Sequence, residues 1–209
     1  RAWAKPLPPP PSRINPAWIA IVEILSRVEQ EPYHWAIGRT TFQKIAYFAT
    51  EAGIPTGLEY RQGSFGPFAR ELKGRITQLV NNGLIREQRL GRMFAVSVGP
   101  TFGDARRAYG GELEKWEGVI ERVADLFMRM QTQQAELAAT VYFAVRSLSK
   151  GAQEKLSEMD VLVEVLRWKQ KRRPPLKKDD VALTIRNLGM LGWLDVKASA
   201  DLPVSEEIL

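Results

Sequence analysis

Apolar residues recur at helical spacing in many separate segments of this chain, and this pattern constrains the fold most. In residues 15–30 five apolar side chains share one helical face: Trp18, Ile21, Val22, Leu25 and Val28. Asn15 and Pro16 are residue types typical of the first positions of a helix. The segment therefore predicts an amphipathic helix that buries one side.

The same spacing predicts further helices at 40–53, 67–82, 101–109, 111–130, 132–148, 157–170 and 177–196, the last ending in a short strand. Two pairs have the spacing of capping boxes, Thr40 with Gln43 and Ser157 with Asp160. Short strands are predicted at 58–63, 84–89 and 92–98, with a tight turn at Leu90 and Gly91 between the last two. We expect a mainly α fold with a small β component. The helix and β-hairpin of residues 67–98 have the outline of a winged helix, a unit that either reads DNA or docks proteins.

Proline marks the expected organisation of the chain. Residues 5–13 read "KPLPPPPSR", which is typical of an extended linker. We expect residues 1–14 to be a linker from a preceding domain, residues 15–200 to form one domain, and residues 201–209 to be a tail. Because residue 1 is Arg, we expect the chain to be cut from a longer protein.

Composition excludes several kinds of chemistry. The chain has no cysteine and a single histidine, His34, so disulfides, thiolate catalysis, cysteine-based zinc sites and sites with two histidines are excluded. No set of residues combines a nucleophile, a base and an oxyanion hole, and we expect neither an enzyme nor a bound cofactor or metal. No apolar run approaches the ~18–20 residues that span a bilayer, so we expect a cytoplasmic chain without a membrane partner.

The stretch "GSFGPFAREL" at residues 63–72 is rich in glycine but does not fit a phosphate-binding loop. It lacks the G-x-G-x-x-G spacing and the Lys-Ser/Thr of a Walker loop, and Pro67 removes a backbone donor. We interpret it as a turn that enters a helix, with Gly66 at the bend and Pro67 at the first helical position.

The chain has a formal net charge of +6, and its clearest electrostatic feature is a cluster of basic residues. Six basic residues gather at 169–178: Lys169, Lys171, Arg172, Arg173, Lys177 and Lys178. They are either a solvated loop between helices or an anion-binding patch for DNA or an acidic protein. The carboxylates Glu112, Glu114, Glu117 and Glu121 are read as a solvated helix face.

Several separated motifs together resemble one family. "QKIAYFATEAG" (43–53) is followed by "GPFAREL" (66–72), and "AELAATVYFAV" (135–145) precedes "VLVEVLRWKQKRRPPLKKDDVALTIRNLGMLGWL" (161–194). Over roughly residues 8–195 the chain resembles the C-terminal domain of DarG antitoxins, which is related to SocA-like (Panacea) domains.

This resemblance implies a helical domain that neutralises a DarT-like toxin, an enzyme that ADP-ribosylates thymidine in DNA, by direct protein contact. It also implies that a separate macrodomain removes the ADP-ribose, so no catalytic residue and no small-molecule substrate is expected in this chain. We expect Tyr60, Arg61, Phe65 and Arg70 to contact the toxin, since exposed aromatic and arginine residues anchor interfaces. The alternative is a DNA-binding module that uses residues 75–98 and 169–178. The net charge of +6 disfavours DNA mimicry by the whole domain, which leaves local mimicry by the carboxylates of 112–125 or 154–164.

Overall fold

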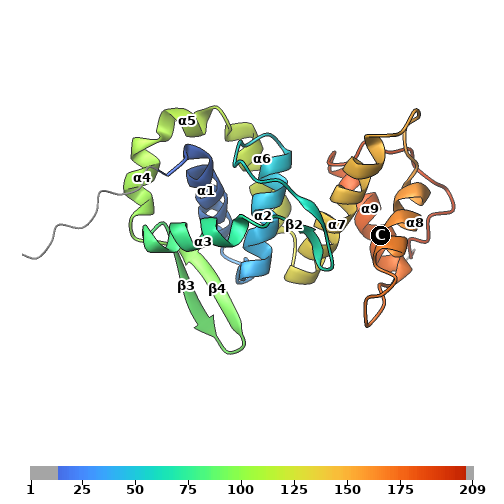
Figure 1. Cartoon of the computed structure of the whole chain (residues 1–209), viewed down its shortest axis with the longest axis horizontal. Helices are drawn as coiled ribbons and strands as arrows, with labels where there is room; N and C mark the ends of the chain where they lie inside the picture. The colour runs from blue at the N-terminus through green and yellow to red at the C-terminus, as the bar shows by residue number, and fades with distance from the viewer. Residues whose placement is uncertain (1–13, 206–209) are drawn as a thin grey trace, which may run out of the picture.

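The structure, a computed structural model, describes residues 14–205, so most of the expected proline-rich linker and the end of the expected tail lie outside the described residues. The fold is mainly α-helical with two small antiparallel hairpins, as expected (Figure 1). Its elements are α1 (Pro16–Gln30), α2 (Arg39–Glu51), β1 (Arg61–Gly63), β2 (Gly66–Phe68), α3 (Leu72–Asn81), β3 (Ile85–Leu90), β4 (Met93–Val98), α4 (Phe102–Ala108), α5 (Gly110–Glu114), α6 (Glu117–Met128), α7 (Thr132–Ser149), α8 (Glu158–Trp168) and α9 (Lys178–Met190).

Helix α1 lies in the middle of the core. Its side chains from Ala17 to Leu25 are all buried, because α2, α4, α5, α6 and β4 pack around it. A helix that is surrounded in this way needs apolar residues on more than one face, which is why the single stripe predicted for it understates its burial. The expected start is confirmed, since the Asn15 side chain accepts a hydrogen bond from the Ala17 amide at 3.0 Å.

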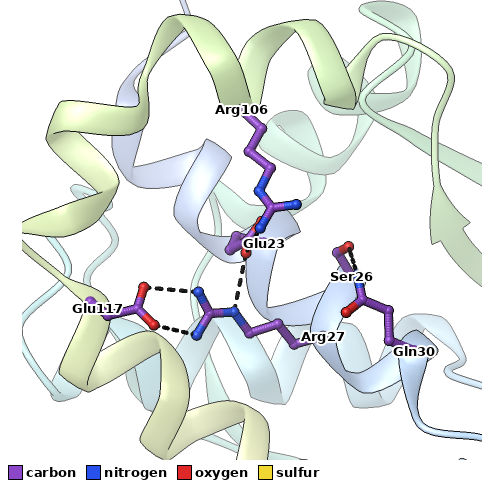
Figure 2. Close-up of polar contacts among 6 residues, drawn as sticks. All are labelled: Glu23, Ser26, Arg27, Gln30, Arg106 and Glu117. Atoms are coloured by element: carbon purple, nitrogen blue, oxygen red, sulfur yellow. Dashed lines mark hydrogen bonds and ion pairs between the residues drawn. The ribbon is translucent and has the colours of Figure 1, made fainter.

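A charged network fastens α1 to the helices that cover it (Figure 2). The buried carboxylate of Glu23 accepts from Arg27 Nε and pairs with Arg106 of α4, both at 3.1 Å. Arg27 also donates to both oxygens of Glu117 at the start of α6, at 2.6 and 2.8 Å. These bonds hold the pKa of Glu117 below its usual value. Glu117 is therefore a structural partner of Arg27 and not part of a purely solvated face.

Helix α7 joins the two ends of the molecule. In Figure 1 it lies between the part built on α1, α2 and α6 and the part that contains α8 and α9. Aromatic rings continue across this junction: Phe48 of α2 stacks on Tyr142 of α7 at 5.0 Å, and Trp193 meets both rings edge-on. The two parts therefore share one core.

Two predicted helices differ from the structure. The helix expected at 67–82 begins only at Leu72, because Gly66 and Pro67 belong to strand β2, paired with β1 in the register Gln62 to Pro67. The helix expected at 111–130 breaks at Lys115 and Trp116 into α5 and α6. With this break, α5 and α6 both pack against α1.

The structure confirms some of the helix ends predicted from the sequence and contradicts others. Ser157 and Asp160 form the expected capping box of α8, and Gly53 follows the end of α2 with φ of 115°. The capping box expected from Thr40 and Gln43 is wrong, because α2 is capped by the backbone of Gly38. The strand expected after α9 is reduced to a single bridge between Ser157 and Lys197.

Candidate functional site

The β1–β2 hairpin presents the residues that the sequence singled out. Its strands pair from Arg61 with Phe68 to Gly63 with Gly66, which leaves Ser64 and Phe65 at the tip. Gly66 has φ of 112°, a conformation that glycine adopts without strain, so the tight return of the chain depends on it. The stretch predicted as the entry to a helix is therefore the end of a hairpin that rests on α7.

Three of the four expected contact residues are exposed. Arg61, Phe65 and Arg70 all face outward, and the Phe65 side chain is 84% exposed. Tyr60 differs, because its ring packs edge-on against Tyr47 at 4.7 Å and burial raises the pKa of its hydroxyl. Its place in the core does not support the expectation that Tyr60 contacts a partner. Phe68 falls within the helix expected at 67–82, but it belongs to strand β2 and is 60% exposed.

The basic cluster of residues 169–178 divides into two sets. Lys169, Lys171, Arg172 and Arg173 line a cavity of about 950 Å³, whereas Lys177 and Lys178 do not. Lys169 is only 8% exposed, while Lys171, Arg172 and Arg173 are exposed. A uniformly solvated loop therefore does not describe this segment.

Contacts between the hairpin tip and the end of α8 form one side of this cavity. The Trp168 indole donates to the Gly63 carbonyl at 3.2 Å, and Lys169 Nζ donates to the Ser64 carbonyl at 2.6 Å. The two segments are 105 residues apart in the sequence. The structure thus brings together the aromatic contact residue Phe65 and the basic cluster, which the sequence presented as separate features.

A second buried cation lies behind the hairpin. Lys44 of α2 is 5% exposed, and its Nζ donates to the Pro67 carbonyl at 3.3 Å. Burial lowers the pKa of Lys44, and the nearby Glu136 carboxylate opposes that shift. Burial also lowers the pKa of Lys169, to about 8, with further lowering from the charges of Lys44 and Arg172. The site therefore concentrates positive charge that its own carboxylates do not balance.

Another exposed apolar surface was not found from the sequence. Tyr33 and Trp35, in the α1–α2 connection, are 96% and 60% exposed. This connection runs beside β4, where the Val96 amide donates to the Ile37 carbonyl at 2.7 Å. Leu90, Met93 and Phe94 of the β3–β4 hairpin are also exposed. Tyr33 and Trp35 flank His34 in the sequence, but two neighbouring aromatic residues do not by themselves show whether their rings are buried or exposed.

Two further kinds of feature bear on function, metal-binding clusters and membrane-spanning helices. Residues 14–205 contain no group of three histidine or carboxylate side chains placed to hold a metal ion. None of the helices within this range is long and apolar enough to cross a membrane.

The hairpin, the cavity and the exposed aromatic residues are the surface features that stand out on this mainly helical fold. No family model matches the chain. The chain is similar to a DNA ADP-ribosyl glycohydrolase from Thermus aquaticus, with 31% identity over 140 residues, which is 64% of this chain and 37% of the relative. The chain therefore spans little more than a third of that relative's length.

Proposed function

We propose that this chain is the toxin-binding part of an antitoxin, which neutralises a DarT-like DNA ADP-ribosyltransferase by direct protein–protein contact. The similarity to a DNA ADP-ribosyl glycohydrolase supports this proposal at the level of the system. The proposal assigns no catalysis to this chain and places ADP-ribose removal in another part of the whole protein. Binding alone is then the task of the described residues.

The observation that carries the proposal is the pair of exposed phenylalanines on the β1–β2 hairpin. Phe65 and Phe68 are 84% and 60% exposed, and burying such a ring gains about 1.5–3 kcal/mol. Arg61, directly opposite Phe68 in the hairpin, and Arg70 are exposed beside them. Aromatic and arginine side chains dominate the binding energy of protein interfaces, so this hairpin has the composition of an interface centre.

The first prediction concerns the Phe65→Ala, Phe68→Ala double variant. We expect it to bind the purified toxin at least about 30-fold more weakly than the unaltered chain, since one interface anchor contributes about 2 kcal/mol or more. Both side chains are exposed, so the fold should tolerate the change. Isothermal titration calorimetry measures the affinity, and a DNA ADP-ribosylation assay measures the inhibition.

A matched control is Tyr33→Ala, Trp35→Ala, which removes two exposed aromatic rings from another surface. We expect near-normal affinity from this control. Absence of any complex with the unaltered chain would reject the antitoxin proposal. Loss of binding in the control alone would move the interface to the α1–α2 connection.

DNA binding is a second candidate function, favoured by the β3–β4 hairpin that follows α3. Arg86, Arg89 and Arg92 are exposed on this hairpin, which projects from the body of the molecule in Figure 1. A mobility shift of duplex DNA that weakens steeply with salt, and that the triple Arg→Gln variant removes, would support operon autoregulation. No shift at low salt would reject it.

A further inference from the structure

The cavity beside the β1–β2 hairpin has features that contact with a protein toxin does not explain. It lies between the hairpin, α7 and the loop that joins α8 to α9, and its volume is about 950 Å³. Binding sites for small molecules have volumes of about 300–1,000 Å³ and combine apolar walls with a few placed polar groups. The apolar part of this lining comes from Phe65, Leu137, Trp168 and Leu176.

The charges in and behind the cavity are unbalanced. Four lining residues are cationic, Lys169, Lys171, Arg172 and Arg173, and two are carboxylates, Glu136 and Asp180. Lys44 lies close behind the hairpin, within electrostatic reach of Lys169. Among the ion pairs between residues 14–205, none includes Lys44, Lys169 or Arg172.

Lys44 and Lys169 are both buried cations, and their charges repel each other. Both Lys44 and Lys169 donate only to neutral backbone carbonyls, those of Pro67 and Ser64. A carbonyl satisfies a hydrogen-bond donor, but it does not neutralise the charge, and desolvated charges are costly without a counter-charge. An anion in the cavity would remove that repulsion. A ligand with two negative charges would remove more of it than a single carboxylate does.

We propose that this cavity binds a phosphate-bearing ligand of nucleotide size, with the phosphate against Lys169 and Arg172. The exposed ring of Phe65 and the apolar side chains of Leu137 and Leu176 provide a surface for the planar base. Glu136 and Asp180 would repel a second anion but accept hydrogen bonds from hydroxyl or amino groups. The mixed lining thus fits a ligand that is anionic at one end and has donors at the other.

An acidic peptide of a protein partner fits these observations less well. Each peptide carboxylate has a single negative charge, whereas four cationic side chains line this one cavity, so a phosphate balances them better. Its carboxylates would also be repelled by the carboxylates of Glu136 and Asp180 in the lining. The inference goes beyond the proposed function, because it does not depend on the toxin.

The experiment uses the full chain and four probes: adenosine diphosphate, inorganic phosphate, a single-stranded oligodeoxynucleotide and a poly-glutamate peptide. Calorimetry at low salt should show binding of adenosine diphosphate that inorganic phosphate competes away. Arg172→Gln should weaken it about tenfold, the effect of one charge-assisted hydrogen bond. Lys178→Gln, which removes the same charge from an exposed residue outside the cavity lining, should change it less than about twofold.

The four probes separate the sources of the phosphate. Binding of adenosine diphosphate identifies a free nucleotide, and binding of the oligonucleotide alone, with the same loss in Arg172→Gln, identifies a nucleic-acid strand. No binding of any phosphate-bearing probe, binding of poly-glutamate alone, or equal effects of Arg172→Gln and Lys178→Gln would overturn the proposal.

Discussion

At the scale of single residues, Lys169 connects the structure of the site to its chemistry. Lysine side chains are seldom buried without a carboxylate partner, yet this one is 8% exposed and its Nζ contacts only a backbone carbonyl among the described hydrogen bonds. Because burial and the neighbouring cations lower its pKa to about 8, its charge changes close to neutral pH. An exposed lysine changes charge only near pH 10.4.

This position leads to a prediction for the pH dependence of anion binding. Lys169 is charged below its folded-state pKa of about 8 and neutral above it, so affinity for adenosine diphosphate should be high at pH 7 and fall as the pH rises through 8. The terminal phosphate remains a dianion over this range, because its second pKa is about 6. The charged groups that face Lys169 are Glu136, Lys44 and Arg172. Burial lowers the pKa of Lys44 as well, so loss of its charge at higher pH would weaken anion binding in the same direction.

Calorimetry across this pH range tests the prediction against Lys169→Arg, whose guanidinium stays charged throughout. The arginine variant should lose most of the pH dependence. Above about pH 7 the phosphate no longer titrates. If the affinity of the unaltered chain stays constant from there to about pH 9.5, the role given to Lys169 is contradicted.

At the scale of elements, the hairpin depends on its fit against α7. A Cβ at Gly66 would lie 3.1 Å from Thr140 Oγ1 and 3.3 Å from Lys44 Nζ. We therefore expect Gly66→Ala to destabilise the protein by about 2 kcal/mol, part from the positive φ and part from overpacking. Gly53→Ala is a matched control, because Gly53 has φ of 115° but a Cβ there would meet nothing within 4 Å.

Urea unfolding measures both variants. The control should lose only the backbone part, about 1 kcal/mol, which is the cost of a left-handed conformation for a residue with a Cβ. Equal losses in the two variants would show that the close approach of Thr140 and Lys44 to Gly66 adds nothing to the cost of a Cβ there.

The hairpin also shows where sequence reasoning reaches its limit. Helices α1, α7 and α8 were predicted closely, because long apolar stripes and residues such as Asn15 and Ser157 mark them locally. Strand β2 has only three residues, too few to show alternation, and Pro67 suits a helix start as well as a short edge strand. The cavity could not be predicted, since Ser64 and Lys169 meet across 105 residues without a local signal.

At the scale of the whole molecule, positive charge predominates, and this disfavours mimicry of DNA by the domain as a whole. The net charge is +6, and the exposed arginines of the β3–β4 hairpin and the cations around the cavity lie on different elements. Several carboxylates in the segments considered for local mimicry are already engaged: Glu117 with Arg27, Glu158 with Arg186 and Glu164 with Arg167. These pairs leave fewer free charges for imitation of a phosphate backbone, so the proposed toxin contact would rely on shape and aromatic side chains.

The continuity of the core across α7 leads to the last prediction, which concerns cooperativity. Trp193 follows α9, yet its ring meets Phe48 of α2 and Tyr142 of α7, and Arg122 of α6 stacks over it at 4.0 Å. Since this one side chain joins both ends of the molecule, residues 14–205 should unfold as a single unit. Far-ultraviolet circular dichroism and tryptophan fluorescence should then give coincident transitions in urea.

Trp193→Ala should lower the free energy of unfolding by about 3 kcal/mol, since it removes a large buried ring together with its aromatic and cation–π contacts. Trp35→Phe is the control, because Trp35 is 60% exposed and its replacement should leave the midpoint nearly unchanged. If the unaltered chain instead unfolds in two separate steps, or if Trp193→Ala shifts only one of them, α8 and α9 form an independent unit. The cavity between the β1–β2 hairpin and α8 would then be a junction that opens before the protein unfolds, and its affinity for an anion would fall at urea concentrations below the main transition.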